Sequence, residues 1–500
     1  MKPETSGASV AHDSVLDARL LRIAGVVVMG TIMAILDTTI VNVAIKDLSH
    51  DFGSPLATMQ WISTGYMLAL ATVIPLTGWA ADRFGTKRLY IGSISMFLIG
   101  SALSGLAWSA GSLIFFRVLQ GLGGGMIMPA GTTILTHAAG PRRIGRVMGI
   151  VGVPMLLGPI LGPILGGWLV DDVSWRWIFF VNLPVGVIAL YLAWRVLEPD
   201  EPQPHHALDW QGLLLLSPGL AIFVFGLATT AAAGSLDSLA GIGSIGVGLV
   251  LLVGFLLHAR QREDALIDIG FFARRAVGAP ALTVFLFGTA FFGVALLMPL
   301  YFQVARGESA LHAGLLLAAQ GFGAMISMPV SARLTDKVGA RRVVVTGVSL
   351  VAVGMLSLSR IDDATSLLRV EPTLFVLGLG MGATMMPAMS AALGSVGRES
   401  VARVNAGLSV LQRIGGSIGT ACLAVVLSQH LMKVAGLAGL HTGHGIPAGA
   451  EGQRVPGMSA AFGHTFLWSF WLILGALLAA FFIRKGKPGT TVELGASTIE

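Results

Sequence analysis

One aspartate and two arginines lie inside long apolar stretches of this sequence, and these are the residues best placed to do chemistry. Asp37 interrupts an apolar run that extends from about residue 20 to about residue 45. A helix rising about 1.5 Å per residue over this run could cross a hydrocarbon layer of about 30 Å. A charge at that depth is costly unless it has a partner or a task. Asp37 is therefore the leading candidate functional residue.

The chemistry open to Asp37 is the uptake and release of a proton. Burial favours the neutral acid and a nearby guanidinium favours the carboxylate, so exposure to each aqueous face in turn could switch the two forms. Arg117 lies in another apolar segment, and counting residues along the helices places it at a similar depth. The alternative is a static buried ion pair that only holds two helices together. Because arginine stays protonated, Arg117 can only tune the carboxylate or compete for it.

Arg413 is the second arginine inside an apolar segment, and the sequence reveals no partner for it. Its side chain could extend toward the inner membrane surface, or it could face a central cavity. Other polar residues inside apolar segments could line the same cavity; they are Asn42, Tyr66, Gln120, Gln320 and Asn405.

The composition places the chain among integral membrane proteins. Of its 500 residues 54% are hydrophobic and only 12% are charged, and the mean hydropathy is +0.80. No soluble protein of this size needs so much apolar surface. The formal net charge of +6 does not indicate nucleic-acid binding, because lysine and arginine occur in short clusters between apolar spans.

A window of about 19 residues predicts fourteen membrane-spanning helices. They lie near 20–45, 57–80, 88–107, 111–136, 146–170, 177–197, 210–231, 239–259, 278–304, 310–331, 343–360, 372–394, 404–432 and 464–484. The loops and tails on the N-terminal side hold 23 of the 32 lysines and arginines, and the opposite side holds seven. Because positive charge concentrates on the cytoplasmic side, both termini are expected to be cytoplasmic.

Two pairs of matching segments divide the chain into similar halves. Residues 81–88 match 335–342 with an offset of 254, and residues 121–130 match 378–388 with an offset of 257. A near-constant offset indicates two six-helix halves in the same membrane orientation, with a central site between them. We expect an all-α integral membrane protein with an N-terminal tail over 1–19, a six-helix bundle over 20–197, a linker with two inserted helices over 198–277, a second bundle over 278–484 with an outer loop at 433–463, and a tail over 485–500.

The six spans of the second half contain no aspartate or glutamate, so Asp37 would act nearly alone in any proton coupling. A cationic substrate and a proton would then compete for one carboxylate, which gives exchange by simple linkage. A neutral lipophilic substrate would instead need a proton step that acts through conformation.

A family resemblance rests on several motifs. The run Gly78-Trp79-Ala80-Ala81-Asp82-Arg83-Phe84-Gly85-Thr86-Lys87-Arg88 resembles the loop signature of the major facilitator superfamily between its second and third helices. Residues 36–45, 117–121, 158–167 and 175–184 resemble the fourteen-helix drug:proton antiporters of the EmrB/QacA type. The resemblance implies the major facilitator fold in a bacterial cytoplasmic membrane and export of small amphipathic compounds in exchange for protons.

The fifth span is rich in glycine and proline, which removes side chains and bends the backbone. The resemblance makes it the antiporter motif that seals the two halves, and the alternative is tight helix packing alone. Its candidate residues are Pro154, Gly158, Pro159, Gly162, Pro163, Gly166 and Gly167.

The loop after the second span combines charges with a glycine that permits a tight turn. Asp82 follows an apolar span directly and could accept hydrogen bonds from backbone amides at a nearby helix start. The resemblance implies a cytoplasmic latch between the halves, and the alternative is a solvated topology signal. The residues concerned are Gly78, Asp82, Arg83, Gly85, Lys87 and Arg88.

The sequence shows no phosphate-binding glycine loop, no zinc-type histidine pattern and no serine nucleophile elbow. We therefore expect a carrier and not an enzyme, with no cofactor or metal and with a proton gradient as its energy source. The expected partners are the lipid bilayer, small amphipathic substrates and protons, without nucleic acid; a periplasmic adaptor protein is a further candidate. The alternatives are an exporter of an endogenous lipid, siderophore or metabolite, and a membrane sensor or passive channel.

Overall fold

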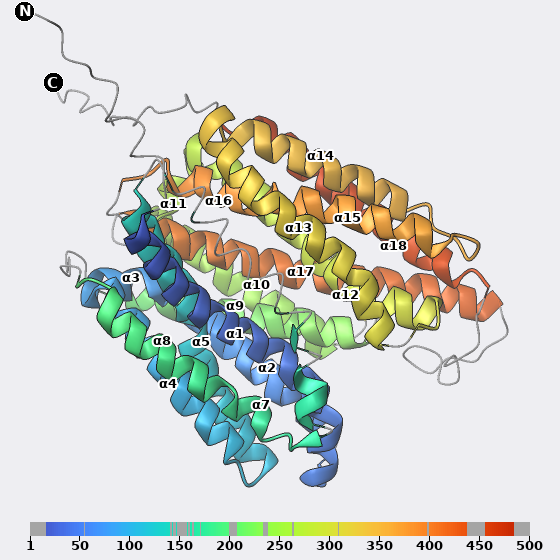
Figure 1. Ribbon diagram of the computed structural model, residues 1–500, viewed down its shortest axis with the longest axis horizontal. Helices are drawn as coiled ribbons and strands as arrows, with labels where there is room; N and C mark the ends of the chain where they lie inside the picture. The colour runs from blue at the N-terminus through green and yellow to red at the C-terminus, as the bar shows by residue number, and fades with distance from the viewer. Residues whose placement is uncertain are drawn as a thin grey trace, which may run out of the picture.

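The computed structural model describes residues 17–54, 56–140, 143, 147, 158, 161–162, 165–170, 172–199, 208–233, 239–262, 265–308, 310–397, 400–437 and 456–484. Every regular element in these ranges is a helix, and most of the helices lie side by side along one direction in two groups (Figure 1). The start of α1 and the end of α18 lie at the same end of the bundle. The all-α fold class expected from the sequence therefore agrees with the described part of the chain.

The first group contains the helices that precede residue 200. They are α1 (Ala18–Asp51), α2 (Leu56–Val73), α3 (Leu76–Phe84), α4 (Thr86–Gly105), α5 (Ala110–Ala139), α7 (Trp177–Phe180) and α8 (Asn182–Val196). Between α2 and α3 the chain bends by 57° at a short break next to Pro75, whose ring cannot continue a helix.

The second group contains the helices after residue 274. They are α12 (Arg275–Leu300) with a π-helical end (Tyr301–Ala305), α13 (Ala310–Val338), α14 (Ala340–Leu358), α15 (Leu367–Gly382), α16 (Met385–Leu393), α17 (Val401–Leu437) and α18 (Met458–Phe481). A hydrophobic core made only of residues between 284 and 483 holds this group together. The core of the first group also includes Met328, Met386, Ala402 and Val410, so the two groups pack against each other.

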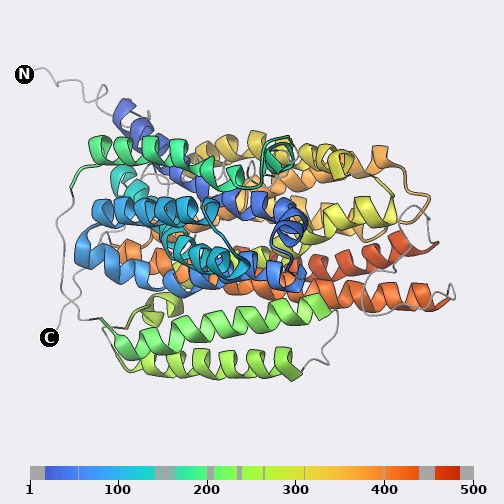
Figure 2. The same cartoon turned by 90° about the horizontal axis from the view of Figure 1, so that it is seen from below.

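Between the groups, α9 (Trp210–Ala233) and α10 (Leu239–Arg260) form a hairpin, followed by the short α11 (Ile269–Ala273). The hairpin packs along one side of the bundle through α9, which contacts α2 and α17 (Figure 2). The end of the hairpin where α9 begins and α10 ends is held by Asp209. Its carboxylate accepts hydrogen bonds from the Gly212 amide (2.9 Å), His258 Nε2 (2.9 Å) and the Leu266 amide (3.4 Å). One carboxylate therefore joins α9, α10 and the segment that leads to α11.

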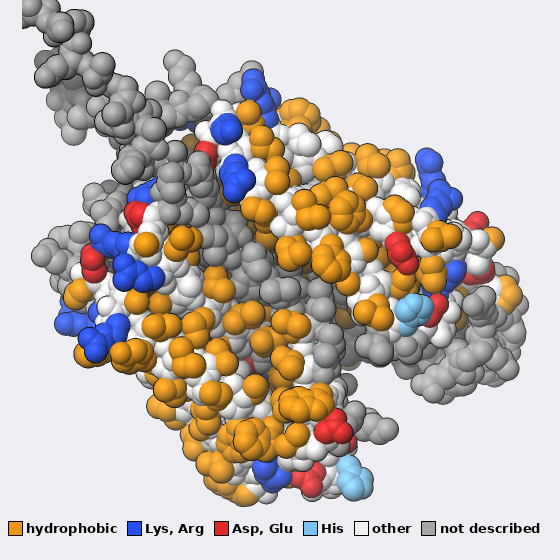
Figure 3. All heavy atoms as spheres, viewed as in Figure 1, with side chains coloured by type: hydrophobic (Ala, Val, Ile, Leu, Met, Phe, Trp, Pro, Cys, Tyr) orange, Lys and Arg blue, Asp and Glu red, His pale blue; other side chains and the backbone are white. Residues whose placement is uncertain are grey.

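On the face shown in Figure 3, hydrophobic side chains cover much of both groups, as a lipid-exposed surface requires. Within the described residues, eleven helices are long and apolar enough to cross a membrane, or twelve if α2 and α3 count as one bent span. The third predicted span is helical as α4 but is not among these, and the fifth lies largely outside the described residues. The expected count of fourteen spans is therefore not confirmed.

Candidate functional site

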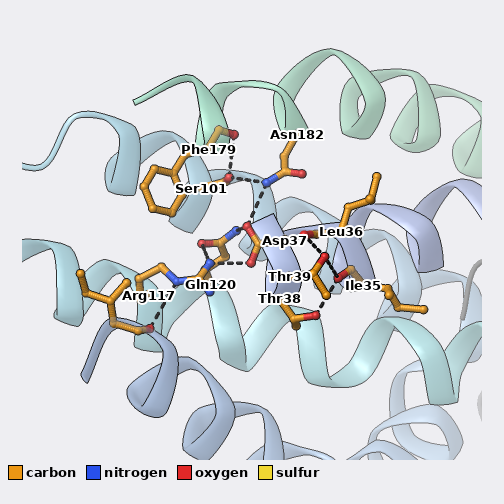
Figure 4. Close-up of polar contacts among 11 residues, drawn as sticks. Ile35, Leu36, Asp37, Thr38, Thr39, Ser101, Arg117, Gln120, Phe179 and Asn182 are labelled. Atoms are coloured by element: carbon orange, nitrogen blue, oxygen red, sulfur yellow. Dashed lines mark hydrogen bonds and ion pairs between the residues drawn. The ribbon is translucent and has the colours of Figure 1, made fainter. Parts of the chain in front are cut away.

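Asp37 lies near the middle of α1, and its side chain is completely buried. The α5 helix brings Arg117 to it, so that Arg117 Nη1 lies 2.5 Å from Asp37 Oδ2 (Figure 4). Only 1% of the Arg117 side chain is exposed. The two charges that the sequence placed at similar depth therefore meet in a fully desolvated ion pair.

Two amides complete the shell around the carboxylate. Gln120 Nε2 donates to Asp37 Oδ1 over 2.8 Å, and Asn182 Nδ2 donates to the same oxygen over 3.0 Å. Gln120 lies one turn beyond Arg117 on α5 and also accepts a hydrogen bond from Arg117 Nη1 over 2.7 Å. Every contact to Asp37 in this shell comes from a donor, which is the arrangement that fits an ionised carboxylate.

Asn182, at the start of α8, is itself held in place. Its Nδ2 also donates to Ser101 Oγ over 3.1 Å, and Ser101 Oγ donates to the Phe179 carbonyl over 2.9 Å. Helices α1, α4, α5, α7 and α8 thus all contribute to one polar network inside the first group (Figure 4). A fully satisfied network of this kind fixes the orientation of each member.

The arginine is stabilised on its other sides as well. The guanidinium carbon of Arg117 lies 4.1 Å from the centre of the Tyr66 ring, a cation–π distance, and Nε is 3.5 Å from the Ile62 carbonyl. Gln120 and Tyr66, which the sequence suggested as cavity residues, are both buried and belong to this network instead. In this arrangement Asp37 can exchange a proton with water only if the network opens.

The approach of α4 to α5 depends on Gly100. A Cβ atom at this position would lie 2.6 Å from the Gln120 backbone, closer than real side chains come. Gly100 therefore lets Gln120 reach Asp37.

The described residues of the glycine- and proline-rich fifth span pack on α1 next to Asp37. A Cβ on Gly158 would collide with Ile35, a Cβ on Gly162 would collide with Thr39, and Thr39 Oγ1 donates to the Gly158 carbonyl over 3.1 Å. These contacts join two segments of the first half. They do not test the prediction that the fifth span seals the two halves against each other. Gly166 is buried and Gly167 half-buried, while Pro154, Pro159 and Pro163 lie outside the described residues.

The segment predicted as a charged loop does join the two groups, but the prediction of a loop is wrong: Gly78, Asp82 and Arg83 lie in α3, and only Gly85 separates α3 from α4. Arg403 Nε of α17 lies 3.3 Å from Asp82 Oδ2, and a Cβ on Gly78 would come 3.3 Å from the Arg403 Cα. One partner of Asp82 is thus a side chain near the start of α17.

Gly85 and Lys87 act within the first group. Gly85 adopts φ +84°, the left-handed region that favours glycine, and so separates α3 from α4. Lys87 Nζ donates to the Trp194 carbonyl over 2.9 Å, at the end of α8. Arg83 and Arg88 are exposed.

Three of the remaining predicted cavity residues, Asn405, Gln320 and Arg413, belong to helices of the second group. Asn405 of α17 is buried and donates to the Pro129 carbonyl of α5 over 2.9 Å, so it joins the groups and does not line an open cavity. Gln320 is half-buried and donates to Met381 Sδ. Arg413 is half-buried between the groups, with Nη1 3.8 Å from Met67 Sδ on α2. The side chain of Asn42 lies outside the described part of the structure.

Three contributing residues, Asn182, Ser101 and Arg403, were not singled out from the sequence. Asn182 is a polar residue inside the predicted span 177–197, and a polar residue inside an apolar span is the same kind of signal that identified Asp37. Ser101 and Arg403 gave no such signal, because serine is common in membrane helices and Arg403 lies in a region expected to be cytoplasmic.

Comparisons with known proteins agree with this geometry. A family model described as Major Facilitator Superfamily matches residues 27–420. A multidrug resistance protein B homolog from Mycobacterium tuberculosis strain H37Rv is 41% identical over 94% of this chain and 91% of its own length. Multidrug resistance protein 3 of Bacillus subtilis is 28% identical over 93% and 95%. A putative multidrug resistance protein, MdtD, from Escherichia coli is 31% identical over 81% and 87%.

Solved structures share the fold at low sequence identity. The human organic anion transporter MFSD10 has a TM-score of 0.61 at 18% identity, covering 91% of this chain and 99% of that one. The proton:xylose symporter XylE has a TM-score of 0.60 at 13% identity, covering 91% and 95%. These two likenesses concern the fold alone. With the family match and the 41% identical relative, they confirm the resemblance read from the loop and helix motifs: this multi-span membrane protein belongs to the Major Facilitator Superfamily.

Proposed function

We propose that this protein is a proton-coupled antiporter that exports small amphipathic compounds across a bacterial cytoplasmic membrane, with both termini in the cytoplasm. The observation that supports it most strongly is the ion pair of Asp37 and Arg117, buried from solvent and closed by two amides. A buried ion pair is a poor way to gain stability, so such a group inside a membrane points to a task in transport. The names of the relatives support drugs and other toxic compounds as the exported class.

The proposed cycle begins from the arrangement described above, with Asp37 ionised and the Asp82–Arg403 contact closing the cytoplasmic end. When the network opens to the outside, a proton binds Asp37 and removes the charge that holds Arg117. The neutral acid no longer balances the guanidinium, which favours a second arrangement of the five helices that meet there. Opening of the Asp82–Arg403 contact then exposes the site to the cytoplasm, where the proton leaves and substrate binds.

Transport in reconstituted vesicles tests this proposal. Purified protein in liposomes, with an acidic compartment on the face that corresponds to the outside, is expected to move a fluorescent amphiphile against its gradient while the pH difference lasts. The Asp37→Asn variant should insert normally and lose this movement, because its amide cannot release a proton.

The matched control is Asp47→Asn, which removes an exposed acid from the same helix. It should transport as the unaltered protein does. Pumping that persists in Asp37→Asn, or that ignores the pH difference in the unaltered protein, would contradict the proposal.

A further inference from the structure

Arg413 lies too deep in the bundle to reach the cytoplasmic surface. It follows Arg403 on α17 by ten residues, about 15 Å along the helix axis, and Arg403 is the residue that meets Asp82 of α3. That distance exceeds the length of an arginine side chain. The Arg413 guanidinium instead points across to the first group, where Nη1 lies 3.8 Å from Met67 Sδ of α2.

No acidic group balances this charge inside the membrane. Asp37 is the one aspartate or glutamate in all fourteen apolar spans of the sequence, and it is already paired with Arg117. Among the residues that the structure describes, the ion pairs include none made by Arg413. An uncompensated cation at this depth is costly, and a thioether sulfur is only a weak acceptor.

Arg413 faces the part of α2 that carries Tyr66 and Met67. The Tyr66 hydroxyl is fully buried and has no hydrogen-bond partner among the described residues. Its ring lies against the buried ion pair, with 4.1 Å between the ring centre and the guanidinium carbon of Arg117. The sulfur of Met67 adds polarisable surface that adapts to different shapes.

We propose that Arg413 is the anchor for an anionic group on the transported amphiphile, so that the substrates are acidic compounds such as carboxylates or sulfonates. This proposal deepens the proposed function and rests on it. Arg413 supplies the opposite charge, and Met67 contacts the apolar body of the compound. Asp37 remains reserved for the proton, because its oxygens are occupied by Arg117, Gln120 and Asn182.

The charge balance of the exchange follows from this assignment. One proton entering against one monoanion leaving moves two charges in the same electrical sense, so an inside-negative potential drives both steps. One proton entering against one monocation leaving moves no net charge.

Binding of matched probes tests the assignment. Dansylglycine, which is anionic, is compared with its neutral amide and with the cation ethidium, using the purified full-length protein and equilibrium dialysis. The unaltered protein is expected to bind the acid about tenfold more tightly than the amide, as a charge-assisted hydrogen bond gives. Arg413→Gln should remove this preference while leaving amide binding unchanged, and Arg413→Lys should keep part of it.

Arg369→Gln, which removes an exposed arginine from α15, is the control for loss of one positive charge. The proposal is overturned if Arg413→Gln binds the acid as tightly as the unaltered protein does, or if the unaltered protein shows no preference for the acid. Transport assays separate this failure from that of the proposed function. Export of ethidium under a pH difference without binding of the acid would contradict the anion site and would still support the proposed antiport. Acid binding that depends on Arg413, without any pH-driven transport, would support the anion site and contradict the proposed antiport.

Discussion

At the scale of single residues, the Asp37–Arg117 pair shows what a sequence can and cannot reveal about a membrane site. Counting residues along two helices was enough to predict that the two charges lie at similar depth, and the structure places them 2.5 Å apart. The partners Asn182 and Ser101 could not be predicted in this way, because depth does not give the rotation of a helix about its axis. Whether Asn182 and Ser101 join the network around Asp37 depends on which faces of α8 and α4 are turned toward α1.

Removing one charge of the Asp37–Arg117 pair should lower the stability of the folded protein far more than removing both charges. Arg117→Met leaves a buried carboxylate without its countercharge, and about 3 kcal/mol of stability is expected to be lost. In the double variant Asp37→Asn with Arg117→Met most of this loss should be recovered, since no buried charge remains. Thermal unfolding of the purified proteins in detergent measures both changes. Equal unfolding temperatures for the single and double variants would show that the charges are not coupled.

At the scale of helices, the positions of most elements could be predicted from apolar length, since thirteen of the fourteen expected spans coincide with described helices. The close approaches between them could not, because they depend on which face of each helix carries a glycine. Gly100 is the clearest case, with the Gln120 backbone directly against it. The role of Arg403 depends likewise on where the start of α17 meets α3.

Gly100→Ala is expected to push α4 away from α5 and to draw Gln120 from the Asp37 carboxylate. Overpacking of this kind costs about 1–3 kcal/mol, and transport should fall together with stability. Gly92→Ala is the control, because a Cβ at that position of the same helix meets nothing within 4 Å. Unfolding temperature and vesicle transport are measured for both; equal behaviour of the two variants would contradict the assigned role.

The corner of the inserted hairpin gives a pH-dependent prediction. Burial by itself raises the pKa of Asp209, but hydrogen bonds from Gly212, His258 and Leu266 outweigh it and hold that pKa below the usual aspartate value. The carboxylate therefore stabilises the folded chain above its unfolded pKa, and this contribution disappears as the pH falls through the lower, folded pKa. Asp209→Ala should cost about 1 kcal/mol near neutral pH.

The difference in unfolding temperature between Asp209→Ala and the unaltered protein should shrink as the medium is made strongly acidic. A difference that grows toward low pH would show that the sign is wrong.

At the scale of the whole molecule, the two groups touch through α17 at the end where α3 lies. Asp82 pairs with Arg403 there, and Asn405, two residues further along α17, reaches Pro129. In the space-filling view the outline of the molecule is indented between the groups at the opposite end (Figure 3). The arrangement corresponds to a carrier that is closed on its proposed cytoplasmic side. The internal repeat indicated two similar halves, but which end they close could not be predicted, since a sequence is compatible with every state of the cycle.

Charge reversal across this contact tests whether it works as a latch. Asp82→Arg should set two positive charges against each other and lower transport about tenfold, a loss of about 1.4 kcal/mol in the closed state. Adding Arg403→Asp restores an opposite pair and should recover most of the transport. No recovery in the double variant, with both proteins folded, would mean that the pair has no latching role.

The central claim is that Asp37 binds and releases a proton during transport, and infrared difference spectroscopy tests it most directly. Spectra of the purified protein are recorded as the pH is lowered and as substrate is added, for the unaltered chain and for Asp37→Asn. A band of a protonated carboxylic acid is predicted to appear and disappear in the unaltered protein and to be missing from the variant. Identical spectra for the two proteins, with Asp37 ionised under every condition, would contradict the account.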